Sequence, residues 1–70
     1  MTSAIKKRSV NIAGHRTSVS IEAPFWDALR AIADKRKVSL NDVIAVIDKQ
    51  RDGNLSSAIR VYVLRELEKQ

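Results

Sequence analysis

The segment RTSVSIE, residues 16–22, alternates between two kinds of side chain at every step. In an extended chain, successive side chains point to opposite faces. One face would carry the core-forming set, Thr17, Val19 and Ile21. The other face would carry the polar set, Arg16, Ser18 and Ser20. This period of two predicts a half-buried β-strand, and a lone strand needs a partner for its backbone N–H and C=O groups.

Two partners are open for this strand. A second copy of the chain can supply the same strand, or residues 9–12 can fold back on it through residues 13–15. Val10 and Ile12 alternate with polar neighbours, and Gly14 can take the positive φ of a tight turn. Because four residues match a seven-residue strand poorly, we expect the second copy as the partner. Residues 9–12 then form at most a short extra strand beside the pair.

Helical periodicity follows the strand directly. Pro24 stands where a first helical turn tolerates its missing N–H. Ser39, with Asp42 three residues later, predicts the capped start of a second helix, and Asn54 predicts the cap of a third. The expected helices cover about residues 23–36, 39–51 and 55–68. The sequence therefore predicts a mostly α-helical domain over residues 16–70 with one β-strand.

The third predicted helix is apolar around more than half of its circumference, through Leu55, Ala58, Ile59, Val61, Tyr62, Val63, Leu64 and Leu67. Such a helix is typical of a protein interior, and two other short helices cannot enclose it within one subunit. A 70-residue chain without cysteine often gains stability by oligomerisation. We therefore expect a homodimer, with assembly into higher-order oligomers as an open alternative, whose core contains Thr17, Val19, Ile21, Trp26, Leu29, Ile44, Ile59 and Tyr62.

The positive charge is concentrated at the N-terminus. The chain has a net charge of +5, and no acidic residue accompanies the first four basic residues, Lys6, Lys7, Arg8 and Arg16. After residue 16, nine basic residues nearly balance eight acidic ones. We interpret residues 1–15 as a basic arm, mobile over residues 1–8. Such an arm favours an anionic partner, with nucleic acid ahead of a membrane; a solvated tail without a partner is the alternative.

The order of strand, helix, serine-capped turn and helix resembles the ribbon-helix-helix family of Arc- and MetJ-type DNA-binding proteins. The resemblance covers about residues 16–50 and rests on IEAPFWDAL, where the strand enters the first helix, and on KVSLNDVI. GNLSSAIRVYVLREL is similar to the third helix of a bacterial subgroup. The chain departs from the family at Lys37, where a glycine usually closes the first helix. Because a left-handed lysine costs about 1 kcal/mol, we expect this turn to be built differently.

The resemblance implies an intertwined homodimer whose two strands form an intersubunit antiparallel ribbon in the DNA major groove, which is about 12 Å wide. We expect base contacts from Arg16, Ser18 and Ser20, since arginine suits guanine O6 and N7. The family also uses the start of the second helix, here Ser39, Leu40 and Asn41, to hold a phosphate. Lys6, Lys7 and Arg8 are expected to add phosphate contacts. The alternative for Arg16 is an ordinary surface residue, and the alternative for Ser39 is a residue that only caps its helix.

Catalysis has little support in the sequence. One histidine, His15, and no cysteine leave no nucleophile–base pair and no metal ligand set, and no cofactor is expected. No stretch approaches the roughly 20 apolar residues of a membrane helix, and no signal peptide is indicated. We therefore expect a cytoplasmic, nucleoid-associated transcriptional repressor that binds double-stranded DNA. The alternative is a protein-interaction module, such as an antitoxin-like subunit that binds a partner through its C-terminal helix.

Overall fold

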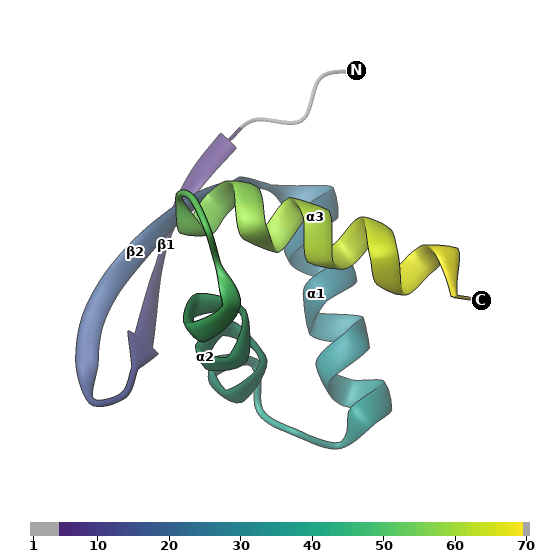
Figure 1. Ribbon diagram of the computed structural model, residues 1–70, viewed down its shortest axis with the longest axis horizontal. Helices are drawn as coiled ribbons and strands as arrows, with labels where there is room; N and C mark the ends of the chain where they lie inside the picture. Colours follow the sequence, from purple (N-terminus) through teal and green to yellow (C-terminus); the bar gives the residue numbers. More distant parts are fainter. Residues whose placement is uncertain (1–4, 70) are drawn as a thin grey trace.

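The computed structural model describes residues 5–69 and consists of a β-hairpin followed by three helices (Figure 1). The elements are β1 (Ile5–Ile12), β2 (His15–Glu22), α1 (Ala23–Arg36), α2 (Leu40–Gln50) and α3 (Leu55–Glu68). The hairpin lies at one side of the molecule, and the helices gather on the other (Figure 1). Helix α2 packs against β1, whereas α1 and α3 pack against β2.

Strand β2 finds its partner within its own chain. It pairs antiparallel with β1 over its full length, from Ile5 opposite Glu22 to Ile12 opposite His15. The connecting residues Ala13 and Gly14 have φ values of 52° and 81°, the positive values that a two-residue hairpin turn requires. The structure therefore corrects the expectation that a second copy pairs with β2, because at this edge of the strand the partner is β1 of the same chain. The chain forms the alternative, the fold-back through Gly14.

Strand β1 has eight residues rather than the four predicted, because its basic residues also alternate between two faces. Arg8 lies opposite Val19 and is half-buried, with its guanidinium 5.3 Å from the centroid of the Trp26 ring. An arginine can cover apolar surface with its stem while its charge stacks on an aromatic face. Residues 5–8 therefore belong to the sheet and not to a mobile arm. Residues 1–4 of the predicted arm lie outside the described residues.

One hydrophobic core lies between the hairpin and the helices. It consists of Val10, Val19, Ile21, Trp26, Leu29, Ile32, Ala33, Val43, Ile44, Ile47, Ile59 and Val63. Six of the eight residues that we expected at a dimer core are thus buried within a single chain. Of the other two, Tyr62 is half-buried and Thr17 is exposed. Thr17 shares the inner face with Val10 but lies close to the turn of the hairpin.

The two predicted helix caps are confirmed. Ser39 Oγ accepts a hydrogen bond from the Asp42 N–H at 3.0 Å. Asn54 Oδ1 accepts one from the Ser57 N–H at 2.8 Å. Each cap satisfies a backbone donor that has no partner within its helix. The caps thereby fix where α2 and α3 begin.

The turn after α1 does not differ from the usual glycine turn, so that expectation was wrong. Lys37 has a φ of 59° and a ψ of 39°, which is the left-handed conformation. Its N–H donates to the Asp34 carbonyl and the Val38 N–H donates to the Ala33 carbonyl, both at 3.1 Å. These two bonds define a Schellman motif. The geometry of the helix end is kept, and lysine accepts the backbone strain.

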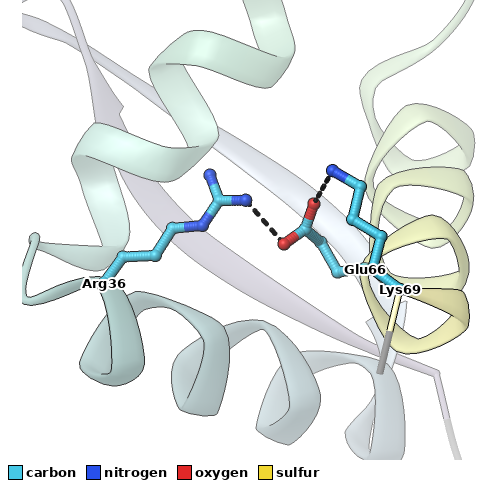
Figure 2. A network of polar contacts seen from close by, with 3 residues as sticks. All are labelled: Arg36, Glu66 and Lys69. Carbon is cyan, nitrogen blue, oxygen red and sulfur yellow. Dashed lines mark hydrogen bonds and ion pairs between the residues drawn. The ribbon is translucent and has the colours of Figure 1, made fainter.

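Helix α3 is tied to the end of α1 by a network of charged side chains (Figure 2). Glu66 accepts hydrogen bonds from Arg36 Nη2 at 2.6 Å and from Lys69 Nζ at 3.0 Å. The hydrogen bond from Lys69 holds the pKa of Glu66 below its ordinary value; burial opposes it, and the hydrogen bond from Arg36 adds to the lowering. The guanidinium of Arg36 also lies 5.8 Å from the centroid of the Tyr62 ring. One arginine thus joins two successive turns of α3 to α1.

Helix α3 buries only one side in the core. Ile59 and Val63 are enclosed, whereas Val61, Leu64 and Leu67 are 47%, 55% and 51% exposed. We call these three residues the α3 strip. The expectation that one subunit cannot enclose this helix therefore agrees with the exposure of the α3 strip, whereas Ile59 and Val63 are covered within the chain.

Candidate nucleic-acid interface

The hairpin turns a polar face away from the helices. Residues directly opposite each other in an antiparallel pair lie on the same face. The register therefore groups three cross-strand pairs: Lys7 with Ser20, Ser9 with Ser18, and Asn11 with Arg16. All six side chains are exposed, and the pairs between them supply the buried Val10 and Val19. We call these six residues the outer face.

The structure brings the three predicted base-contacting residues together on this face. Arg16, Ser18 and Ser20 are the outer-face residues of β2, and β1 contributes an equal number. Sequence reasoning missed Ser9 and Asn11 as members of the site. Their alternation with Val10 and Ile12 was visible in the sequence. Only the register with β2 shows that they lie beside the predicted contacts.

The N-terminal ends of two helices flank the hairpin, one at each edge. The Asn11 backbone N–H donates to Asn41 Oδ1 at 3.4 Å. The Ser20 backbone N–H donates to Ser56 Oγ at 3.2 Å. Asn41 and Ser56 are the second residues of α2 and α3. Because free N–H groups and the helix dipole make helix N-termini favourable for anions, both edges of the outer face suit a phosphate backbone.

The predicted phosphate contacts at α2 occupy three different environments. Ser39 caps the helix, Leu40 is half-buried against the core, and Asn41 holds the edge of β1. The side chain of Leu40 therefore has no part in a polar contact. What the three residues share is the backbone at the start of α2.

The basic residues of β1 divide between the two faces of the hairpin. Lys7 belongs to the outer face, whereas Lys6 and Arg8 lie opposite Ile21 and Val19 on the inner side. Arg8 is occupied by Trp26, and among the described residues no hydrogen-bond partner is found for its buried Nε atom. Of the three predicted phosphate contacts in this segment, only Lys7 lies beside Arg16, Ser18 and Ser20.

The one acidic residue of the two strands is neutralised at the base of the hairpin. Glu22 Oε1 accepts a hydrogen bond from Arg60 Nε at 2.9 Å. This hydrogen bond, together with one from a backbone N–H, holds the pKa of Glu22 below its ordinary value, and burial opposes them weakly. Glu22 lies on the same side of the sheet as the outer face, but its charge is paired with Arg60, so Lys7 and Arg16 meet no unpaired acidic side chain of the two strands.

Other kinds of site find no support in the part of the chain that the structure describes. Residues 5–69 contain no cluster of three or more His, Asp or Glu side chains placed to bind a metal ion. In the same range, no helix has the length and apolar character needed to cross a membrane.

A comparison with known families gives a match over most of the chain. The family model described as a ribbon-helix-helix domain matches residues 5–67. The match begins at the first residue of β1 and extends into the last turn of α3, so it includes the outer face and both flanking helix ends. Neither a curated protein nor a solved structure gives a significant match to the chain.

Proposed function

We propose that this chain, which belongs to the ribbon-helix-helix domain family, binds double-stranded DNA in a sequence-specific manner through the outer face of its hairpin. Ribbon-helix-helix domains are generally DNA-binding transcription regulators or antitoxins. Their fold is a DNA-binding, non-enzymatic one. The observation that carries the proposal is the outer face itself, where six exposed polar residues on two paired strands are flanked by two helix N-termini.

The dimensions of the hairpin suit the major groove. Two strands lie about 4.8 Å apart, and the groove is about 12 Å wide, so a two-stranded ribbon and its side chains fit within it. We propose that Arg16, Ser18 and Ser20 contact base edges there. Arg16 offers two parallel donors to guanine O6 and N7, whereas the serines can donate to or accept from any base.

Phosphate contacts are proposed for both sides of the groove. The α2 start, with Ser39, Leu40 and Asn41, presents backbone N–H groups at the β1 edge. Lys7 and Lys6 add positive charge near the open end of the hairpin. Arg8 is left out of the proposal because its guanidinium is already stacked on Trp26.

We propose that the active form is a homodimer, since ribbon-helix-helix domains typically bind DNA and dimerise. The exposed apolar side chains of Val38 and Val46 and the α3 strip support a contact between helices of two copies. The predicted intersubunit ribbon would need the outer edge of β2, where the Ser20 N–H is held by Ser56. It would also join two hairpins into a four-stranded sheet about 14 Å across, at 4.8 Å per strand spacing, before its side chains are counted. We therefore assign the groove-binding ribbon to the hairpin of each chain.

The biological role that we propose is repression of transcription by a cytoplasmic protein bound to the nucleoid. The second candidate is an antitoxin-like subunit, which the exposure of the α3 strip favours. The two differ in what covers this strip. If the homodimer covers the α3 strip, no further protein partner is needed to explain it, and the repressor role accounts for the structure. If the strip stays exposed in the dimer, a protein partner is favoured, because large exposed apolar patches mark interaction sites.

The proposal is tested by comparing the triple variant Arg16→Ala, Ser18→Ala, Ser20→Ala with the unchanged protein. Duplexes recovered from a random pool compete with scrambled duplexes at several salt concentrations. A dimer with about 6–10 phosphate contacts should show a log–log salt slope of about −5 to −9. The triple variant should keep this slope and remain folded at the assay temperature, because each exposed alanine costs within about 1 kcal/mol. It should lose its preference for the selected duplex, at about 1–3 kcal/mol per base contact.

The matched control is Asn41→Asp, which keeps an oxygen acceptor for the Asn11 N–H but adds negative charge at the start of α2. This variant should weaken binding to all duplexes about equally, because a phosphate contact carries no sequence information. Binding that is insensitive to salt would show that DNA is the wrong partner. A triple variant with full sequence preference would show that the outer face does not recognise bases.

A further inference from the structure

We infer that a groove between the end of α2 and one face of α3 binds a small carboxylate with an apolar body. The groove has a volume of about 430 Å³, within the range of about 300–1,000 Å³ that is typical of small-molecule sites. Its walls come from the end of α2, the connecting turn and five residues of α3. We call it the α2–α3 groove. It lies apart from the hairpin, so the inference goes beyond the proposed function and does not depend on it.

The floor of the α2–α3 groove is apolar. Ile47 belongs to the buried core, and Ala58 and Tyr62 pack against that core while remaining half-buried. Val61 also lines the groove and is largely exposed. A ligand with an apolar body would remove the surface of Val61 and Tyr62 from water, which is the dominant favourable term in such an association.

Contacts behind the groove hold two of its walls in place. At the turn, Arg51 Nε donates to Asp48 Oδ1 at 2.7 Å and Arg51 Nη1 donates to the Gly53 carbonyl at 2.6 Å. On the floor, the Tyr62 ring lies with its centroid 5.8 Å from the guanidinium of Arg36 on α1. The groove is therefore formed before a ligand arrives, as small-molecule sites usually are.

The charge at the far end of the groove selects the ligand. Arg65 lines the groove, is exposed, and takes part in no ion pair or side-chain hydrogen bond found within residues 5–69. An α-helix rises about 1.5 Å per residue, so Arg65 lies about 12 Å along α3 from Ser57 at the turn. The acidic residue that lines the groove, Asp52, belongs to the turn. An anionic group is thus favoured at the Arg65 end.

The chemistry of Arg65 favours a carboxylate as this anionic group. The planar guanidinium offers two parallel N–H donors, which match the two oxygens of a carboxylate. With the carboxylate at Arg65, the rest of the ligand lies over Val61, Tyr62 and Ala58 in the direction of the turn. The predicted ligand class is therefore a carboxylic acid with an aromatic or aliphatic body.

The proposed contact between two copies leaves this groove open. Four of the residues that support that contact, Val38, Val46, Leu64 and Leu67, do not line the α2–α3 groove. Only Val61 belongs both to the groove and to the α3 strip. A ligand can therefore enter the groove in a homodimer that is formed through the other four residues.

The test is a titration of the isotope-labelled full chain with 4-phenylbutyrate, followed by NMR, and a parallel titration with the neutral 4-phenylbutanamide. The carboxylate should shift the amide signals of residues 47–65 and not those of the hairpin, and it should bind more tightly than the amide. Arg65→Gln should weaken binding of the carboxylate about 5-fold, which corresponds to about 1 kcal/mol for an exposed ion pair, and leave binding of the amide unchanged. The matched control is Lys49→Gln, because Lys49 is an exposed cation of α2 outside the groove; this variant should bind both probes as the unchanged protein does.

Four results would overturn the inference. Absence of shifts at the groove with either probe at millimolar concentration would show that the groove is not a ligand site. Equal binding of the two probes would refute the preference for a carboxylate. Equal weakening by Lys49→Gln and Arg65→Gln would indicate only a general attraction to a basic protein. Groove signals that move with protein concentration in the absence of a probe would show that a second copy fills the groove. None of these results bears on DNA binding, which the duplex competition tests separately.

Discussion

Proline substitutions at two neighbouring residues of β2 should distinguish a hairpin ribbon from an intersubunit ribbon. Backbone N–H groups in an antiparallel strand alternate between the two edges. Since the Ser20 N–H points outward to Ser56, the Ser18 N–H also points outward, whereas the Thr17 N–H points to Val10 inside the hairpin. Ser18→Pro therefore removes a donor only from the outer edge. Thr17→Pro removes one from the β1–β2 ladder.

The expected magnitudes differ clearly. Thr17→Pro deprives the Val10 carbonyl of its partner beside a side chain that is only 4% exposed, and a stranded buried acceptor costs about 1–3 kcal/mol. For a domain of this size, each kcal/mol lowers the melting temperature by about 4–8 °C. Ser18→Pro leaves the ladder intact, and proline is tolerated on an open strand edge. Its cost should stay within about 1 kcal/mol.

Thermal circular dichroism measures the stability, and sedimentation velocity measures the oligomeric state. Ser18→Pro should remain folded and keep the oligomeric state of the unchanged protein, whereas Thr17→Pro should melt at a lower temperature. A folded Ser18→Pro variant that is monomeric while the unchanged protein is dimeric would refute this reasoning. It would show that the outer edge of β2 pairs with a second copy.

Two further predictions concern the stability of the single chain. Lys37→Gly should raise the melting temperature by about 4–8 °C, because it relieves about 1 kcal/mol of left-handed strain without changing the two Schellman bonds; an unchanged or lower melting temperature would contradict this. The pKa of Glu22 is lowered in the folded chain, so its contact with Arg60 stabilises the fold above the unfolded pKa near 4.5 and is lost as the pH falls through the folded pKa. The melting temperature of Glu22→Gln should therefore fall less steeply below pH 4.5 than that of the unchanged protein, and parallel curves would show that the ion pair contributes nothing.

Features that depend on near neighbours in the chain were predictable from the sequence. The caps at Ser39 and Asn54 each join residues three positions apart. The two faces of β2 follow from alternation alone, and this placed Arg16, Ser18 and Ser20 together without knowledge of the fold. Lys37 is the exception among local features. The hydrogen bonds that close the helix outweigh a backbone strain of about 1 kcal/mol. The prediction of a different turn had considered only this strain.

Features that depend on distant contacts could not be predicted in the same way. The length of β1 depends on Arg8, whose position on the inner face is stabilised by Trp26, a residue on another element. The partner of β2 at its paired edge was predicted to be a second copy, because a hairpin and an intersubunit ribbon bury the same side chains, Val19 and Ile21, and the sequence pattern cannot distinguish them. Asn11 was missed because its place beside Arg16 follows from the register, and the register follows from the turn.

The register is also what connects the fold to the proposed recognition of DNA. A slip of one residue would move Arg16, Ser18 and Ser20 from the outer face to the core face, because strand side chains alternate with a period of two. The two-residue turn at Ala13 and Gly14 prevents such a slip at one end. The bonds to Asn41 and Ser56 oppose it along the two edges. The turn residues and the two helix residues, none of which is proposed to contact a base, thus determine which side chains face the DNA. A change in the turn should therefore alter the sequence preference even where it leaves the affinity for phosphate unchanged.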